Sequence, residues 1–168
     1  YGRIEEKVKN LTLLLQAYKK SNLPNRGIKL YIIGEGKDVS ALIRKISDLQ
    51  LEGSVYHLSF LNNPFPYVKK ALFTVLTSYY EGFPRVLIES LACGTPVVSV
   101  DCKSGPKEII QHKLNGLLVP NHNMLLLAKA LNTFTDDKAL YNKCKGNAKD
   151  SVRKFSVENI AKQWVELL

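Results

Sequence analysis

The segment YYEGFPRVLIESLACGTPVV (residues 79–98) contains a turn, an apolar helix and the start of a buried strand. Gly82 and Pro84 mark the turn, and VLIESLA has the apolar spacing of a helix packed against a core. PVVSV (96–100) is a continuous apolar run rich in valine, which is typical of a strand buried on both faces. The turn, helix and strand therefore indicate an α/β protein.

The same alternation continues on both sides of this segment. Hydrophobic periodicity and turn residues predict helices at 7–21, 38–49 and 84–93, and strands at 28–33, 54–60, 72–78 and 96–100. SGPKEII (104–110) predicts a short helix, and Asn115-Gly116 a turn into LLVP. From Asn123 the chain is predicted to be helical to its end, in three pieces broken near Asp136 and Phe155, with Ser156 as the N-cap of the last. Continuous apolar strands between helices predict a doubly wound, Rossmann-like parallel sheet.

A sheet of this kind binds its ligand beyond the carboxyl ends of its strands. Here those ends are residues 34–36, 58–60, 80–82 and 101–105. Three of the four contain glycine, as the close approach of a backbone to a ligand requires. We therefore expect the ligand at this edge of the sheet.

The turn at Gly82 has the features of an anion site. Pro84 suits the first turn of a helix, so we expect the helix to begin near residues 83–85, directly after a strand. Its free N–H groups and positive dipole end would attract a diphosphate, and Gly82 has no side chain to block that approach.

Two glutamates flank this predicted helix start. Glu81 would repel a phosphate, so we expect it to accept hydrogen bonds from sugar hydroxyls. Glu89 lies about one helical turn beyond Arg85 in an otherwise apolar helix and must find hydrogen-bond donors, which a ribose diol would supply. The alternatives are that Glu89 pairs with a buried Lys or Arg and that Glu81 only occupies a turn. The glycine, the proline and the strand-to-helix switch between the two favour a ligand site.

Composition limits the class of protein. Of 168 residues, 45% are hydrophobic and 23% charged, which is ordinary for one globular domain. The apolar runs are too short for a membrane span, and the N-terminal residues have no signal-peptide pattern. Cys93, Cys102 and Cys144 form no CxxC pair, which predicts reduced thiols in a cytoplasmic protein and argues against a metal site.

The net charge of +9 favours an anionic partner, which could be a nucleotide, a nucleic acid or an acidic membrane face. The basic residues of 143–154 are spread around a helix without interleaved exposed aromatics, which argues against nucleic acid. Peripheral contact of the whole protein with the inner face of an anionic membrane is a further alternative.

Several ordered motifs together resemble one enzyme family. They are Gly2-Arg3, Lys9-Asn10, IIGEG (32–36), the E-x7-E pattern within EGFPRVLIESLACGTPVV (81–98), SGPKEI (104–109), NGLLVP (115–120) and KFSVENIAKQW (154–164). The chain closely resembles the retaining family-4 glycosyltransferases, which have the two-domain GT-B fold. The resemblance implies that residues 1–168 are the C-terminal, donor-binding domain, which holds a sugar nucleotide without a metal or other cofactor. It also implies an N-terminal acceptor domain that is absent from this chain.

The resemblance assigns roles to individual residues. Arg3 and Lys9 would grip the donor diphosphate and stabilise the leaving group, and Glu81 would hold hydroxyls of the transferred sugar. These three are the implied catalytic residues. The implied donor-binding residues are Gly34, Leu58, Ser59, Gly82, Phe83, Pro84, Arg85, Val86 and Glu89, with Glu89 on the ribose and the turn at 58–60 near the base. Ser59 and Asn10 depart from the pattern, since glycine is common in the family at both positions.

The implied function is retaining transfer of a hexosyl or N-acetylhexosaminyl group from a nucleoside-diphosphate sugar. We expect a UDP-sugar rather than a GDP-sugar, and a glycan or lipid-linked acceptor in surface polysaccharide, lipopolysaccharide or glycoprotein glycan synthesis. The isolated domain should bind donor but transfer poorly or not at all. The alternatives are a nucleotide-sugar epimerase or phosphorylase of the same fold, and a non-catalytic basic module that binds nucleic acid.

Overall fold

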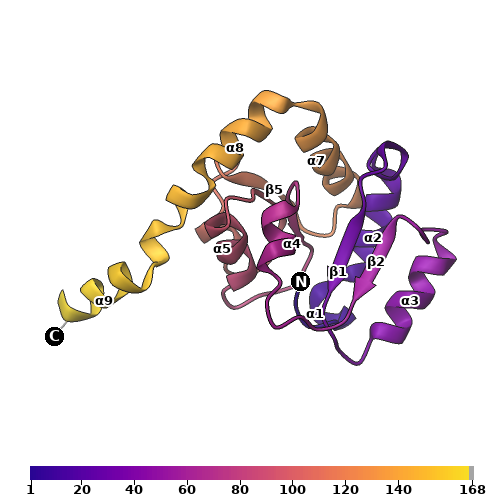
Figure 1. The fold of residues 1–168 in the computed structure, drawn as a ribbon, viewed down its shortest axis with the longest axis horizontal. Coiled ribbons are helices and arrows are strands. Elements are labelled where there is room, and N and C mark those ends of the chain that lie inside the picture. Colours follow the sequence, from indigo (N-terminus) through magenta and orange to yellow (C-terminus); the bar gives the residue numbers. More distant parts are fainter. Residues whose placement is uncertain (167–168) are drawn as a thin grey trace.

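The computed structural model describes residues 1–166 and has the predicted α/β class (Figure 1). All strand pairs are parallel within this part of the chain, as predicted for continuous apolar strands. One sheet consists of β1 (Leu30–Ile33) and β2 (Val55–Leu58), and the other has the order β3 (Thr74–Leu76), β4 (Val97–Asp101), β5 (Gly116–Pro120). The division into two sheets differs from the single sheet expected from the sequence. Both β1 and β3 are therefore edge strands.

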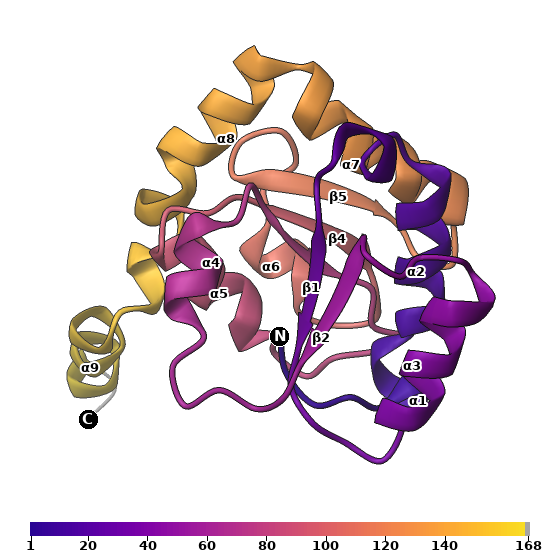
Figure 2. The same ribbon diagram turned by 45° about the vertical axis from the view of Figure 1, so that its right-hand side comes forward.

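Helices surround both sheets (Figure 2). They are α1 (Glu6–Lys9), α2 (Leu11–Lys20), α3 (Val39–Asp48), α4 (Phe65–Lys70), α5 (Arg85–Ala92), α6 (Pro106–Ile109), α7 (Met124–Asp136), α8 (Lys138–Ser151) and α9 (Val157–Glu166), with single 3-10 turns at Pro24–Arg26 and Arg153–Phe155. α9 projects from the body, and none of its residues is buried (Figure 1). The predicted last helix is described as far as Glu166, and residues 167–168 lie outside the described part.

Three local predictions need correction. The helix expected at 7–21 is broken at Asn10, which adopts the left-handed conformation (φ 49°) and accepts a hydrogen bond from the Leu13 N–H at 3.4 Å to cap α2. The sequence analysis missed α4, because six residues are too few to show a helical period. It also treated residues 116–120 only as the exit from a turn, whereas they form β5. The predicted cap is confirmed, since Ser156 Oγ accepts the Asn159 N–H at 3.3 Å.

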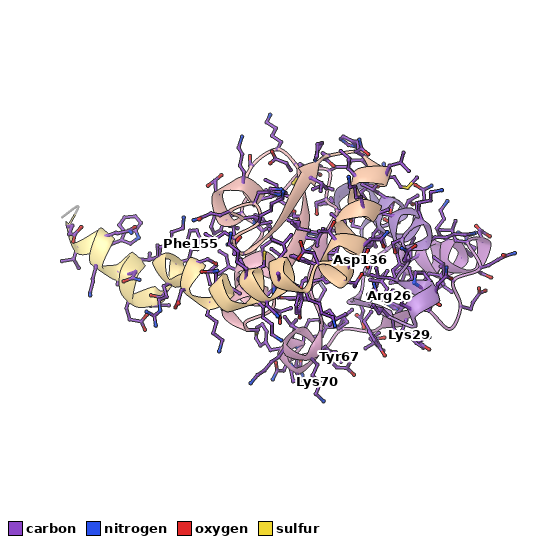
Figure 3. All side chains as sticks on the ribbon, turned by 90° about the horizontal axis from the view of Figure 1, so that it is seen from above. Arg26, Lys29, Tyr67, Lys70, Asp136 and Phe155 are labelled. Carbon is purple, nitrogen blue, oxygen red and sulfur yellow. The ribbon has the colours of Figure 1, made fainter. Side chains whose placement is uncertain are left out.

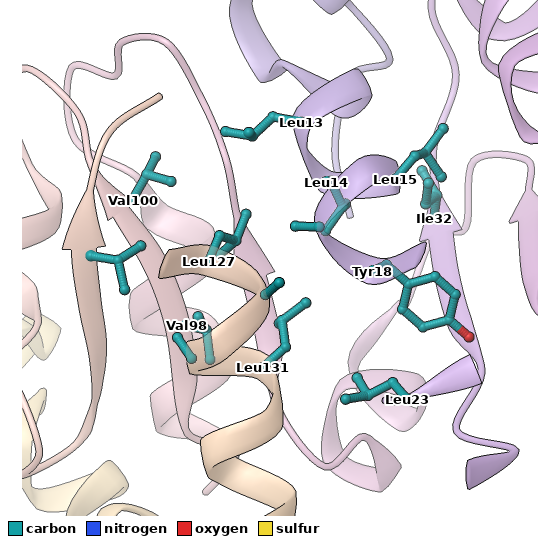
Figure 4. Packing of buried hydrophobic residues seen from close by; sticks show 14 of the residues in the cluster. Leu13, Leu14, Leu15, Tyr18, Leu23, Ile32, Val98, Val100, Leu127 and Leu131 are labelled. Carbon is teal, nitrogen blue, oxygen red and sulfur yellow. The ribbon is translucent and has the colours of Figure 1, made fainter. Parts of the chain in front are cut away.

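The second sheet is covered on both faces, which confirms the doubly wound prediction. Val98 and Val100 of β4 belong to a core with α2 and α7, and Figure 4 shows these valines near leucines of both helices. Val97 points to the opposite face and packs in a cluster with Leu87 and Leu91 of α5. Alternate residues of one strand therefore enter two cores. Full burial of each such side chain contributes about 1.5–3 kcal/mol to the free energy of folding.

The first residues of the chain lie against the carboxyl end of β1. The Gly2 N–H donates to the Ile33 carbonyl at 2.9 Å, and the Ile4 N–H donates to the Glu35 carbonyl at 2.8 Å. A Cβ atom on Gly34 or on Gly36 would collide with the carbonyl groups of Gly2 and Ile4 respectively. Both glycines therefore have a packing role that the sequence analysis did not name. The donor-binding role of Gly34 stays a prediction.

Membrane-spanning helices and clusters of metal ligands are both absent from residues 1–166. No helix in this range combines the length and the apolarity needed to cross a bilayer. Nor does this range contain a group of three or more His, Cys, Asp or Glu side chains placed to hold a metal ion. The three cysteines are free thiols, with Cys102 and Cys144 buried.

The close packing around Gly36 predicts that a single methyl group added there strongly lowers the free energy of unfolding. Gly36→Ala should lower the free energy of unfolding by about 2 kcal/mol, because its Cβ meets the Ile4 backbone rather than a flexible side chain. Gly146→Ala is the matched control, since Gly146 lies within α8 with open space around it and should gain about 0.5–1 kcal/mol. Urea unfolding measures both values. Equal effects of the two substitutions would contradict the packing role of Gly36.

Candidate functional site

The end of α1 is hydrogen-bonded to the residues that follow β3. The Thr77 hydroxyl donates to the Lys9 carbonyl at 2.9 Å, and the Tyr79 N–H donates to the Val8 carbonyl at 2.9 Å. Thr77 directly follows β3, and Tyr79 comes two residues later. The side chain of Lys9 is therefore held over the edge of the sheet where the sequence analysis placed the ligand.

Lys9 and Glu81 form an ion pair at this edge. The Lys9 ammonium lies 2.7 Å from Glu81 Oε1, and their side chains are only 24% and 13% exposed. The Ser78 hydroxyl donates to the same carboxylate oxygen at 2.6 Å. Charges that are only partly exposed to water cost free energy unless they have a partner, and here each group is the partner of the other. The sequence analysis named both residues but not their pairing, and it missed Ser78.

Gly105 packs closely against the turn between Glu81 and α5, whereas Gly82 within that turn has open space around it. Gly105 has φ 87°, and a Cβ atom there would collide with the Pro84 ring. The α5 helix begins at Arg85, within the predicted range, but Pro84 is its N-cap residue rather than part of its first turn. Phe83 is 45% exposed, and its ring makes an edge contact with Phe155 at 5.4 Å between centroids.

The amino end of α5 is only partly open to an anion. The Arg85 N–H donates to the Phe83 carbonyl at 2.9 Å, and the Leu87 N–H donates to the Pro84 carbonyl at 2.9 Å. Pro84 has no N–H to offer. Two of the donors expected at this helix start are therefore used within the turn. The positive end of the α5 dipole still points to the turn.

Glu89 finds its donors within the chain. The Tyr1 hydroxyl donates to Glu89 Oε2 at 2.9 Å and lies 3.2 Å from the Val86 carbonyl, while Arg85 Nη2 lies 3.5 Å from Glu89 Oε1. Burial, followed by the hydrogen bond to Glu89, raises the pKa of the Tyr1 phenol above its usual value. The Glu89 side chain is 27% exposed, so it is less deeply buried than its apolar helix implies. The sequence held no signal for Tyr1, because 88 positions separate the two partners.

The other predicted site residues are more scattered. Arg3 is mostly exposed, and its guanidinium lies 3.9 Å from the Glu5 carboxylate. At the end of β1 the Gly34 N–H donates to the Leu58 carbonyl at 2.9 Å, and the exposed Ser59 follows β2. The structure thus joins Lys9 to Glu81 and Arg85 to Glu89. It contains no ion pair between Arg3 and either of these groups within residues 1–166.

This edge of the two sheets therefore offers a half-buried cation, two carboxylates and a helix amino terminus. Positive charge from Lys9 and α5 would stabilise negative charge that develops on a phosphate. Carboxylates accept hydrogen bonds from hydroxyl groups. The combination fits a ligand that is anionic at one end and rich in hydroxyl groups at the other.

Comparison with known proteins agrees with this chemistry. The family model for glycosyl transferases group 1 matches residues 1–151. An N-acetylgalactosamine-N,N'-diacetylbacillosaminyl-diphospho-undecaprenol 4-α-N-acetylgalactosaminyltransferase of Campylobacter jejuni is 38% identical over 167 residues, which are 99% of this chain and 45% of that protein.

Solved structures share the fold. A TarM variant from S. aureus, in complex with fondaparinux, α-GlcNAc-glycerol and UDP, superposes with a TM-score of 0.90 at 28% identity, over 99% of this chain and 34% of that chain. The C-terminal domain of a group 1 glycosyl transferase from Francisella tularensis superposes with a TM-score of 0.80 at 25% identity, over 94% of this chain and 84% of that chain. This chain thus spans less than half the length of the Campylobacter and S. aureus proteins, and the family resemblance found in its sequence is confirmed. The chain belongs to the glycosyl transferases group 1 family and has the fold of a GT-B domain.

Proposed function

We propose that this chain is the donor-binding domain of a retaining, metal-independent glycosyltransferase that uses a UDP-sugar. The observation that carries the proposal is the Lys9–Glu81 ion pair, held at the carboxyl end of β3 beside the first turn of α5. The pair supports the proposal because its cation could bind a diphosphate together with the helix dipole, and its carboxylate could accept hydrogen bonds from the attached sugar.

The donor would lie along the turn from Lys9 to Glu89. Its diphosphate would contact Lys9 and the amino end of α5, its ribose would contact Glu89, and its sugar would contact Glu81. In the transfer step the bond from the anomeric carbon to the diphosphate oxygen breaks, and the electron pair leaves with UDP. The acceptor oxygen forms the new bond to the anomeric carbon, and its proton passes to the departing diphosphate oxygen. Lys9 and the helix dipole would stabilise the charge that builds on the departing diphosphate.

Donor binding would exchange the partner of Lys9. In the present structure Glu81 neutralises Lys9 at 2.7 Å. A diphosphate carries more negative charge than one carboxylate, so we expect it to draw the ammonium away. Glu81 would then keep its hydrogen bond from Ser78 and accept further bonds from sugar hydroxyls. The ion pair thus holds Lys9 and Glu81 in position before the donor binds, and neither charge is left without a partner.

The relatives support this choice of substrates. The S. aureus structure holds UDP and α-GlcNAc-glycerol, and the Campylobacter relative is named for the transfer of N-acetylgalactosamine to a diphospho-undecaprenol acceptor. We infer a hexosyl or N-acetylhexosaminyl donor and a glycan or lipid-linked acceptor held by a second domain. We further propose a cytoplasmic location, with peripheral contact to an anionic membrane through the net charge of +9. The family assignment does not favour the epimerase, phosphorylase or nucleic-acid-binding alternatives.

Glu81→Gln should separate transfer from nucleotide binding. Removing the charge frees Lys9 for the diphosphate, so calorimetric titration should show UDP bound about three- to tenfold more tightly. Sugar transfer by the intact enzyme should fall about 100-fold or more, because an amide accepts fewer hydroxyl bonds than a carboxylate.

The matched control for this change is Glu158→Gln, which removes the same charge from the exposed helix α9. Glu158→Gln should change neither the affinity for UDP nor the rate of sugar transfer. Weaker UDP binding in Glu81→Gln, or transfer that persists at the original rate, would contradict the assigned role of Glu81.

Glu89→Ala should weaken UDP binding without abolishing the fold. Loss of the acceptor for the ribose diol should raise the dissociation constant at least about tenfold, equivalent to about 1.4 kcal/mol. Asp150→Ala, which removes an exposed carboxylate paired with Arg153 at 3.2 Å, serves as the control. Equal affinities for UDP in the Glu89 variant and the unchanged chain would place the ribose elsewhere.

Binding of UDP should not depend on a divalent metal. Lys9 and the α5 dipole would supply the positive charge that offsets the negative diphosphate. UDP titrations with magnesium and with EDTA should therefore give the same affinity. A short oligonucleotide should bind weakly or not at all in the same buffer at two salt concentrations. Binding of UDP only with magnesium would refute metal independence, and salt-sensitive oligonucleotide binding without UDP binding would refute the transferase assignment.

A further inference from the structure

A shallow pocket of about 410 Å³ lies between the start of α2 and the residues that follow β3 and β5. Its lining includes Asn10, which directly follows Lys9, and Tyr79, which is two residues before Glu81. The pocket therefore adjoins the Lys9–Glu81 ion pair, although neither member of the pair lines it. Its volume is within the range of about 300–1,000 Å³ that is usual for small-molecule sites. No proposed contact of the donor lies in this pocket.

Tyr79 and His122 form an aromatic pair on one wall of the pocket. Their ring centroids are 5.4 Å apart, and their planes differ by 31°. Both residues are exposed. The Asn121 side chain holds their two loops together, because its Nδ2 donates to the Tyr79 carbonyl at 3.3 Å and its Oδ1 accepts the His122 N–H at 2.8 Å. The pair therefore presents exposed aromatic surface on a backbone that is fixed by hydrogen bonds.

Polar side chains at the start of α2 bring free hydrogen-bonding groups to the same pocket. Asn10 is only 5% exposed, and its Oδ1 accepts the Leu13 N–H at 3.4 Å, but its Nδ2 donates no hydrogen bond within residues 1–166. Every fully buried side-chain nitrogen or oxygen in this range has a partner, so the free Nδ2 must reach open space at the pocket wall. The side chains of Thr12 and Gln16, which also line the pocket, make no hydrogen bond in the described part of the chain.

The pocket is poorly suited to an anion. Glu6 lines it, and the Glu6 carboxylate accepts the N–H groups of Leu11 at 2.9 Å and of Thr12 at 3.2 Å. Because the Leu13 N–H is bonded to Asn10, the first three N–H groups of α2 are all used within the chain. Among residues 1–166, no lysine or arginine lines the pocket, although the chain has a net charge of +9. A neutral ligand is therefore favoured over a phosphate.

We propose that this pocket binds one neutral pyranose unit of a glycan. The C–H groups on one face of the sugar ring would lie on the aromatic pair, whose ring faces carry partial negative charge. The sugar hydroxyls would accept from the Asn10 and Gln16 amides and donate to the Glu6 carboxylate. The further assignment of this unit to the acceptor rests on the proposed function, under which it would lie next to the transferred sugar. The donor-binding domain would then contribute to the choice of acceptor.

Titration of the chain with methyl glycosides, followed by the backbone amide signals in NMR spectra, tests this proposal. The probes are the methyl α-glycosides of glucose, galactose, N-acetylglucosamine and N-acetylgalactosamine, without nucleotide. At least one should shift the Leu13, Gln16 and Tyr79 amide signals saturably, with a dissociation constant on the order of 1–10 mM. Glycerol has hydroxyl groups but no ring, and glucuronate is negatively charged. Both should bind at least about tenfold more weakly.

Two substitutions and a matched control locate the binding. Tyr79→Ala removes one ring of the aromatic pair and should weaken binding at least about tenfold. Gln16→Ala changes an exposed position of α2, where alanine favours the helix, and should weaken binding about threefold. Tyr67→Ala is the control, because Tyr67 is 44% exposed, compared with 38% for Tyr79, and does not line this pocket. Figure 3 shows Tyr67 beside Lys70 of the same helix, α4. The Tyr67 variant should bind the sugar like the unchanged chain.

Each outcome decides the proposal. Saturable binding that weakens in the Tyr79 and Gln16 variants but not in the Tyr67 variant supports it. The absence of saturable shifts with all four glycosides up to about 100 mM overturns it, as does binding that is unchanged in Tyr79→Ala or tighter for glucuronate.

The affinity for UDP separates this proposal from the proposed function. A chain that binds UDP but none of the glycosides loses the sugar site and keeps the donor-binding function. A chain that binds a glycoside but no UDP keeps the sugar site, whereas the donor-binding function and the acceptor assignment are then wrong.

Discussion

The ion pair between Lys9 and Glu81 joins the two halves of this structure. Lys9 ends α1, which follows the segment paired with β1, whereas Glu81 follows β3 of the other sheet. The Thr77 hydroxyl and the Tyr79 N–H both donate to α1 at the same junction. A largely buried ion pair is a poor source of stability, because desolvation of both charges offsets their attraction. The proposed exchange of Glu81 for a ligand would give such a pair a purpose at the carboxyl edge of the strands.

The amino-terminal residues reach both parts of the candidate site. The Gly2 N–H donates to the carbonyl of Ile33 in β1, and the chain reaches Lys9 only seven residues later. The Tyr1 hydroxyl donates to Glu89. The path of this one segment therefore fixes the position of the Lys9 ammonium and supplies a hydrogen-bond donor to Glu89.

Much of the fold and the centre of the site could be predicted because their signals are local. Gly82, Pro84 and the apolar periodicity after them define a turn, a helix and a strand within twenty residues of sequence, with Glu81 in the turn and Glu89 in the helix. The contacts of Glu89 with Tyr1 and of Glu81 with Lys9 could not be predicted from the residues alone, since they join segments 88 and 72 positions apart. The break at Asn10 was missed because one residue in the left-handed conformation leaves the hydrophobic period intact.

The most direct test of the account is a crystal structure of this chain with bound UDP. The account predicts that the Lys9 ammonium lies within hydrogen-bond distance of a diphosphate oxygen and no longer contacts Glu81, while the ribose hydroxyls donate to Glu89. A structure in which UDP is bound, the Lys9–Glu81 distance remains 2.7 Å and the diphosphate lies away from α5 would contradict it.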